Sequence, residues 1–325
     1  MKMNKPGNSI CRLWILIIVA GIIQSCSTSK KIMPVAIDTD CPPVMGYVTS
    51  DFVLLDSLLA DTLLTSSYSR NTIVVANAYG LTNDIRELKA LNNNEIKLNS
   101  TDSIRLLSLE KANEIDKTLS LATLEVQTLQ TFLSCNNLKL IRVKTDLAAI
   151  NNKIRSAYTN SSIIIGVGSS VLVAGAVIND GQLNSGDFKD WVGIAGGLVA
   201  AGLAIISETV NKKVSLSHSH NAIAAIWNGI NDQGVFTDNT WYLLNQPYLS
   251  HSSELSMREQ ILNTWNTSKS ILGEEDNLDY LPVLLSSGGK YTEDMIQLRI
   301  DMLEEIKHNI VEISRLLSMV TFEVQ

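Results

Sequence analysis

The sequence predicts an all-α protein: an elongated antiparallel helical bundle with long coiled-coil-like helices and a glycine-rich hydrophobic helical hairpin. The first observation is a lack of helix breakers, because no proline lies between Pro43 and Pro247 and no glycine between Leu81 and Ile165. The second is two series of apolar residues spaced alternately three and four positions apart, as in a heptad repeat. The third is a pair of long segments that contain no charged residue and several small ones.

The composition limits the kinds of protein that this chain can be. Of its 325 residues 45% are hydrophobic and 18% are charged, and 26 basic against 33 acidic residues give a net charge of −7. Soluble domains are usually about 25% charged, so the low value indicates a membrane-associated or secreted protein. The apolar content excludes intrinsic disorder. No basic patch stands out, and we therefore expect no nucleic-acid partner.

Residues 1–25 are predicted to be a leader that takes no part in the fold. Basic residues precede an apolar run from Leu13 to Ile23, which at about 11 residues is too short to span a bilayer but typical of a signal peptide. The run ends in Ile23-Gln24-Ser25-Cys26, which resembles the bacterial lipobox.

This resemblance implies a lipoprotein signal peptide, cleaved before Cys26, with acyl chains such as palmitate on that cysteine. Membrane lipid would then be a partner through the Cys26 anchor. Ser27 stands where an aspartate marks inner-membrane retention, so the resemblance implies an outer-membrane lipoprotein of the cell envelope, on the periplasmic or the surface face. The alternative is an ordinary signal peptide with an incidental Cys26.

Residues 26–45 are predicted to be a tether between the anchor and the fold. They hold Pro34, Pro42 and Pro43 among small and polar residues. Two cysteines remain in the mature chain, Cys41 and Cys135. In an oxidising envelope they are a candidate disulfide, and two free buried thiols are the alternative.

Residues 46–160 are predicted to form a long-helix bundle, with shorter helices at Asp51–Leu64 and Asn71–Leu91. A helix from Thr101 to Thr159 would be roughly 85–90 Å long. Its heptad seam consists of Ile115, Leu119, Ala122, Val126, Leu129 and Leu133, then Leu140, Val143, Leu147, Ile150, Ile154 and Ala157. Asn136 interrupts this seam, and we expect a local break or bend there. The alternative is a buried amide that sets the register.

Residues 161–207 are predicted to form an apolar, glycine-rich hairpin, with arms at Ser161–Ile178 and Trp191–Ser207. Each arm is about 26 Å long as a helix, at the lower limit for crossing a bilayer core. Small residues recur at four-residue spacing in both arms, which lets two helix backbones approach closely. These residues are Gly166, Ser170 and Ala174 in one arm and Gly193, Gly197 and Ala201 in the other.

Three environments remain open for this hairpin. We expect it to insert into or lie against a membrane, or to pack between subunits. Burial inside a soluble bundle is the second interpretation. The third, an inner-membrane hairpin, would place four basic residues on the same side as the anchor, against the positive-inside rule.

The rest of the chain is predicted to be helical too. Residues 208–290 would form a helical cap with an aromatic cluster, in which Trp227, Trp241 and Trp265 pack with Phe236, Tyr242 and Tyr248. Residues 291–325 would form a C-terminal bundle helix with Thr292 as its N-cap. Its seam consists of Leu303, Ile306, Ile310, Ile313, Leu317 and Val320.

Candidate chemistry is sparse, and we expect no catalytic residue, no cofactor, no metal and no enzyme activity. His218 and His220, with His251 or Asp232, offer the one alternative, a zinc site. On a helix the pair would diverge by about 200°, so it converges only in a strand or loop.

The Ile163–Ile178 run and the later His220-Asn221-Ala222-Ile223 and Trp241-Tyr242-Leu243 segments resemble uncharacterised envelope lipoproteins of Gram-negative bacteria. The order of long helix, apolar hairpin and long helix is also loosely similar to cytolysin-A-like α-helical pore-forming toxins. The expected function is therefore structural or interaction-based: membrane association, self-association or assembly with envelope proteins. The alternative is a pore-forming or membrane-perturbing effector with the hairpin as its inserting element.

Overall fold

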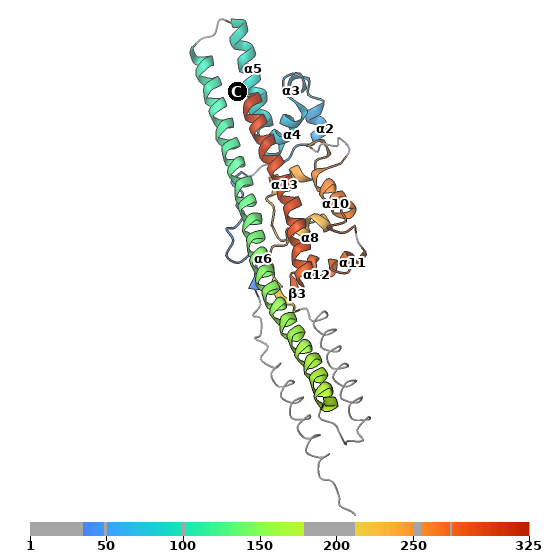
Figure 1. The fold of residues 1–325 in the computed structure, drawn as a ribbon. Coiled ribbons are helices and arrows are strands. Elements are labelled where there is room, and N and C mark those ends of the chain that lie inside the picture. The colour runs from blue at the N-terminus through green and yellow to red at the C-terminus, as the bar shows by residue number, and fades with distance from the viewer. Residues whose placement is uncertain are drawn as a thin grey trace, which may run out of the picture. The chain divides into compact units, whose positions relative to one another are not determined.

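Two long antiparallel helices, α6 (Asp102–Ile178) and α13 (Glu293–Val324), lie side by side in this computed structural model (Figure 1). The structure describes residues 35–48, 51–98, 102–178, 212–249, 255–273 and 275–324. Within those ranges it leaves out the side chains of 94–98 and 164–178, and a few single side chains elsewhere. The described chain is mostly helical, which confirms the predicted fold class at that level.

Polar contacts fix the register of α13 on α6. Gln130 Nε2 donates to Ser314 Oγ at 2.9 Å, and Asn137 Nδ2 donates to Glu304 Oε1 at 2.7 Å. Lys144 Nζ then donates to Gln297 Oε1, also at 2.7 Å. The residue numbers of the partners on α13 decrease as those on α6 increase, so the two helices run in opposite directions.

The two apolar series face each other in this interface. On α6 the buried positions run from Ile115 to Leu147, and on α13 every predicted seam residue from Leu303 to Val320 is buried. The seam on α6 ends earlier than predicted, because Ile150 is 38% exposed and Ala157 is exposed. Lys144 already meets Gln297, close to the first residue of α13, so the later positions have no α13 opposite them.

The predicted break at Asn136 is wrong, since α6 continues through it for 77 residues, or about 115 Å. Both amides at this point are accommodated within the packing. Asn136 is 5% exposed beside the N-terminal segment, and Asn137 bonds to α13. The first arm of the predicted hairpin, residues 161–178, continues α6 without interruption.

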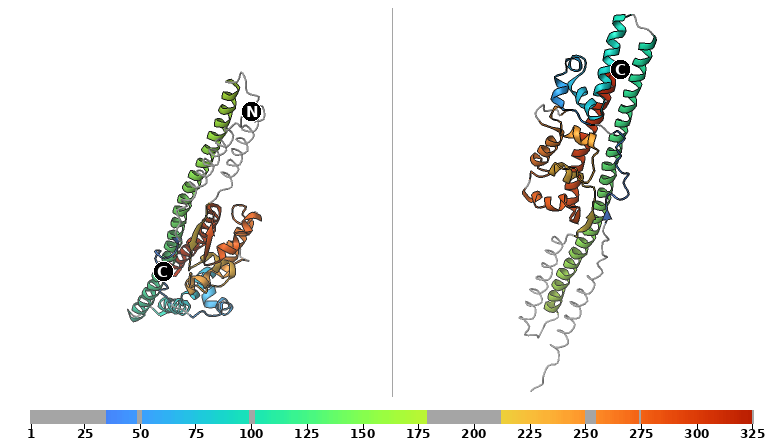
Figure 2. Two further views of the ribbon diagram at one scale, coloured as in Figure 1. Left: turned by 90° about the horizontal axis from the view of Figure 1, so that it is seen from below. Right: turned by 180° about the vertical axis from the view of Figure 1, so that it is seen from behind.

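Shorter helices cover one end of the long pair (Figure 2). They are α2 (Leu55–Leu59), α3 (Thr62–Thr65), α4 (Arg70–Ala78) and α5 (Thr82–Leu98). Lys111 of α6 holds α5 through ion pairs with Asp84 at 3.1 Å and Glu87 at 3.3 Å. Glu323, near the end of α13, accepts from the backbone N–H of Ser69 at 2.6 Å and so joins α13 to the N-cap residue of α4.

A three-stranded sheet that the sequence did not predict lies beside α6. Its strands are β1 (Val35–Ala36), β2 (Val214–Ser217) and β3 (Gly288–Tyr291), in the order β1-β2-β3. β1 is parallel to β2, and β3 is antiparallel to it. Gly288 permits the close approach, because its φ is 153° and an added Cβ would lie 2.4 Å from the Leu216 carbonyl oxygen.

The predicted tether is wrong from Val35 onward. Val35 and Ala36 pair with β2, Ile37 is 1% exposed and Cys41 is 8% exposed. Three prolines in a short stretch suggested a linker, yet this part of the chain is bound into the fold by strand pairing and burial. Residues 26–34 lie outside the described residues.

Between β2 and β3 the chain forms a set of short helices. They are α8 (Ala222–Asn228), α9 (Asp238–Leu244), the 3₁₀ turn η1 (Pro247–Leu249), α10 (Met257–Thr267), α11 (Glu275–Leu278) and α12 (Leu281–Leu285). Their aromatic rings form pairs: Trp227 stacks on the fully buried Trp265, and Phe236 on Trp241. Tyr242 stacks instead on Phe52, from outside the predicted cap.

α13 begins as predicted, with Thr292 Oγ1 accepting from the Met295 backbone N–H. Among the residues that the structure describes, no helix is long and apolar enough to cross a membrane.

Candidate functional site

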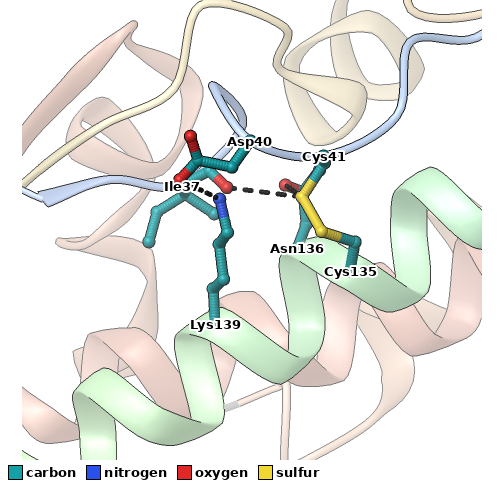
Figure 3. Close-up of a disulfide and its surroundings, with 6 residues drawn as sticks. All are labelled: Ile37, Asp40, Cys41, Cys135, Asn136 and Lys139. Carbon is teal, nitrogen blue, oxygen red and sulfur yellow. Dashed lines mark hydrogen bonds and ion pairs between the residues drawn. A yellow bond between two sulfur atoms is a disulfide. The ribbon is translucent and has the colours of Figure 1, made fainter.

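A disulfide fixes the N-terminal segment, residues 35–48, to the middle of α6 (Figure 3). Cys41 and Cys135 are bonded with their Cα atoms 5.7 Å apart and 94 positions apart in sequence. The sequence alone is compatible with either a disulfide or two free thiols at these positions. A disulfide sulfur carries no hydrogen, so the 3.4 Å approach of Cys41 Sγ to Asn136 Oδ1 is a packing contact.

Further contacts show which way the N-terminal segment runs along α6. Asp40 pairs with Lys139 at 3.3 Å, Cys41 bonds to Cys135, and the Tyr47 N–H donates to Glu125 Oε2 at 3.3 Å. The residue numbers of the partners on α6 decrease as the residue numbers of the segment increase. The segment is therefore antiparallel to α6, and its first residue, Val35, lies toward the C-terminal half of that helix.

Asp38 organises the loop after β2. Its Oδ2 accepts from Ser219 Oγ at 2.7 Å and from the His220 backbone N–H at 2.8 Å, and it lies 3.3 Å from His220 Nδ1. Burial alone would raise the pKa of Asp38. The hydrogen bonds from His220 and Ser219 outweigh burial, so the pKa lies below its ordinary value and the carboxylate is charged.

Serine, histidine and aspartate meet here, but not as a nucleophilic relay. A relay needs the serine on one ring nitrogen and the carboxylate on the other. Ser219 Oγ and Asp38 Oδ2 both lie against Nδ1 of His220, at 3.1 and 3.3 Å, and the serine bonds directly to the carboxylate. The arrangement joins the N-terminal segment to the loop after β2.

A second polar cluster is buried between the sheet and α13. The Tyr291 hydroxyl donates to the Val283 carbonyl at 3.1 Å, so its oxygen accepts from His218 Nε2 at 2.7 Å. Burial and the charge of Arg299 lower the pKa of His218 to about 3. The ring is therefore neutral, with its proton on Nε2.

Arg299 completes this cluster and is 2% exposed. Its guanidinium donates to the Leu284 carbonyl at 3.2 Å and to Asn221 Oδ1 at 3.3 Å, and burial lowers its pKa. Asn221 Nδ2 in turn donates to two backbone carbonyls around α12. The cluster thus braces β2, β3, α12 and α13 against one another.

The histidine pair offers no shared metal site. His218 faces Tyr291 in the interior, whereas His220 faces Asp38. No group of three or more metal-ligating side chains occurs among the residues that the structure describes. His251 is outside them.

The other predicted site residues fall on or beyond the edge of the described chain. Gly166, Ser170 and Ala174 lie on α6, where only the helical backbone is described. Cys26, Gly193, Gly197 and Ala201 lie outside the described residues.

A surface pocket of about 330 Å³ opens between α10 and α13. Met257 and Gln260 line it from α10, and Glu305, His308 and Glu312 line it from α13. Arg315 already pairs with Glu312, and Asn309 bonds to Glu305, so both carboxylates have partners within the protein.

Sequence reasoning missed Asp38, Asn221, Arg299 and Glu125, which are buried polar residues. For Arg299 a signal was present. It lies four positions before Leu303, so it continues the α13 seam, where a buried charge needs a dedicated set of acceptors. Asp38 carried no such signal, because its partners come from residues about 180 positions away.

Comparison with known proteins found no match to this chain among protein-family models, curated proteins or solved structures.

Proposed function

We propose that this chain is a lipid-anchored protein of the bacterial cell envelope with a structural or interaction role. The observation that carries the proposal is the disulfide between Cys41 and Cys135, because such bonds persist in oxidising compartments outside the cytosol. An exported chain requires a leader, and residues 1–26 have the order of charge, apolar run and cysteine that a lipoprotein leader needs. Multiple acyl chains on Cys26 would hold the protein stably in a membrane.

The proposal extends to the apolar segment, which would mediate membrane association or assembly with other envelope proteins. Supporting it, α6 passes without interruption from the disulfide-linked middle of the fold into the charge-free residues 161–178. The small residues of 161–207 would let two helical arms pack closely as a hairpin. The α6–α13 pair would then be the coiled-coil-like part of an elongated antiparallel bundle.

Metabolic labelling with a palmitate analogue tests the anchor. The wild-type chain should be labelled, and Cys26→Ala should lose the label. Cys11→Ala is the matched control, because Cys11 lies within the predicted leader and is not the predicted acylation site, and it should be labelled like wild type. Label that persists in Cys26→Ala would contradict the assignment.

The continuity of α6 into an apolar segment also favours a second function, a pore-forming or membrane-perturbing effector. Dye leakage from vesicles separates the two. Leakage caused by the wild-type chain and lost in Gly197→Leu, which blocks close packing of the arms, would support the effector. Stable membrane binding without leakage would support the anchored structural role.

A further inference from the structure

Four basic residues lie near one level of α6, shortly before its apolar residues 161–178. Lys153 and Arg155 lie on α6, and Lys212 and Lys213 directly precede β2. The Lys212 backbone N–H donates to Asn151 Oδ1 at 2.9 Å, and this bond brings the two pairs to the same level of α6. We call these four residues the basic collar.

The sequence next to these four residues is poor in acidic residues, although the protein as a whole is acidic. From Leu147 to Ile178 the sequence of α6 contains no acidic residue, and the acidic residues nearest in sequence to Lys212 and Lys213 are Glu208 and Asp232. Lys153 and Arg155 are both exposed. Two positions apart on a helix they point about 200° apart, so their charges lie on nearly opposite sides of α6.

Along α6 the basic residues of the collar come first, and the apolar residues follow them. Ser161, the first residue of the predicted apolar arm, follows the collar residues of α6 by six to eight positions, or roughly 9–12 Å of helix. Charged headgroups and hydrocarbon follow each other over a similar depth at a bilayer surface. A helix lying flat on a membrane would carry its basic residues on one face, whereas basic residues on opposite faces suit a helix that meets the surface end-on.

The N-terminal segment approaches the same end of α6. β2 lies between Lys212, which is beside Asn151, and His220, whose ring contacts Phe132. The strand therefore runs antiparallel to α6, away from the collar. β1 is parallel to β2, with Val35 opposite Leu216. The Val35 end of β1 therefore lies on the collar side of the sheet.

Chain length allows the anchor to reach that level. Leu216 is four residues from Lys212, or about 13 Å of strand. Nine residue steps separate Cys26 from Val35, and they span at most about 30 Å. Acyl chains on Cys26 and the collar are thus able to meet one surface.

From this geometry we infer that the basic collar binds the headgroups of anionic phospholipids in the bilayer that holds the lipid anchor. Of the proposed function, this inference depends only on the lipid anchor at Cys26. Anionic lipid attracts each lysine or arginine near the surface by about 1 kcal/mol, which favours such a bilayer over a neutral one. The charge-free segment of α6 then points into that membrane, and the disulfide-linked body stands away from it.

Vesicle flotation tests the collar without the anchor. The chain from Ser27 to Gln325 keeps the whole described fold and lacks Cys26. It is mixed with vesicles of phosphatidylcholine alone, or with vesicles in which about 30% of the lipid is phosphatidylglycerol. The second kind has a strongly anionic surface. The collar variant replaces Lys153, Arg155, Lys212 and Lys213 by glutamine. The control variant replaces four other basic residues by glutamine, so that its net charge equals that of the collar variant. These residues are Lys89, Lys117, Arg142 and Lys269.

We expect wild type and control to partition at least tenfold more strongly onto the anionic vesicles, and the collar variant to lose at least tenfold of this binding. Circular dichroism checks that each variant is folded. Equal binding of the collar and control variants, equal binding to both vesicle types, or no binding of wild type would each overturn the inference. Palmitate labelling at Cys26 reads out the anchor separately, so failure of the collar and failure of the anchor are distinguishable.

Discussion

Single buried polar residues tie segments together that are far apart in the chain. Glu125 is fully buried on α6 and accepts from the Tyr47 N–H and from the hydroxyls of Thr237 and Thr240. Burial raises the pKa of Glu125 in spite of these bonds. His218 is the interior group whose ionisation has the clearest consequence for stability, because its ring is neutral and enclosed.

We expect acid to destabilise the protein through His218. The unfolded histidine titrates near pH 6.5, whereas the folded pKa is about 3. Between those values the unfolded state binds the extra proton, so stability falls as pH falls below 6.5, by up to about 1.4 kcal/mol per pH unit. Urea unfolding at pH 7 and pH 5 measures this. His218→Gln should show a shallower loss, and an equal loss would assign the acid sensitivity to other groups.

At the scale of elements, the disulfide joins the N-terminal segment to α6 across 94 positions. A closed loop of that size restricts the unfolded chain strongly, and the loop-entropy model gives about 4–5 kcal/mol of stabilisation. We therefore expect Cys41→Ser/Cys135→Ser to have a free energy of unfolding lower by several kcal/mol. Reductant should lower the wild-type value to a similar level and leave the double variant unchanged. If reductant also lowered the free energy of unfolding of the double variant, the reductant would be acting at a site other than this disulfide.

A second prediction concerns the continuity of α6. Spin labels at Thr131→Cys and Ile163→Cys should lie about 48 Å apart in backbone terms, because 32 residues separate them on an unbroken helix. Pulsed electron-spin resonance measures this distance with the native disulfide intact. Thr131→Cys/Ala149→Cys, at about 27 Å, is the control for the part of α6 that precedes the collar. A short or broad distribution for the longer pair alone would place a break between Ala149 and Ile163.

The helices and the sheet differ in how far the sequence specified them. Burial on one side of a helix leaves a regular 3–4 spacing, so the seams at Ile115–Leu147 and Leu303–Val320 were readable. The strands have two to four residues each, β3 begins with two glycines, and their partners are far apart in sequence. Such short pairings leave no period to detect. The end of the α6 seam also depended on where α13 begins in space.

At the scale of the molecule, the two halves of α6 have different surroundings. From Asp102 to Leu147 the helix packs against α5 and then α13, and the disulfide fixes the N-terminal segment to it. Beyond Asn151 it carries two of the four collar residues and then the charge-free residues 161–178. One continuous helix thus connects a cross-linked body to a segment with the chemistry of a membrane interface, and the N-terminal segment enters from that same side.

This arrangement predicts how far the body extends from a membrane. If the collar lies at the headgroups and α6 meets the surface end-on, Asp102 lies 51 residues, or about 75 Å, above it. Neutron reflectometry on a supported anionic bilayer should then give a protein layer at least about 60 Å thick, which allows for a tilt of roughly 35°. The collar variant, held by its lipid anchor alone, should give a thinner or less ordered layer. A wild-type layer near 30 Å would mean that α6 lies along the surface, and the end-on orientation would be wrong.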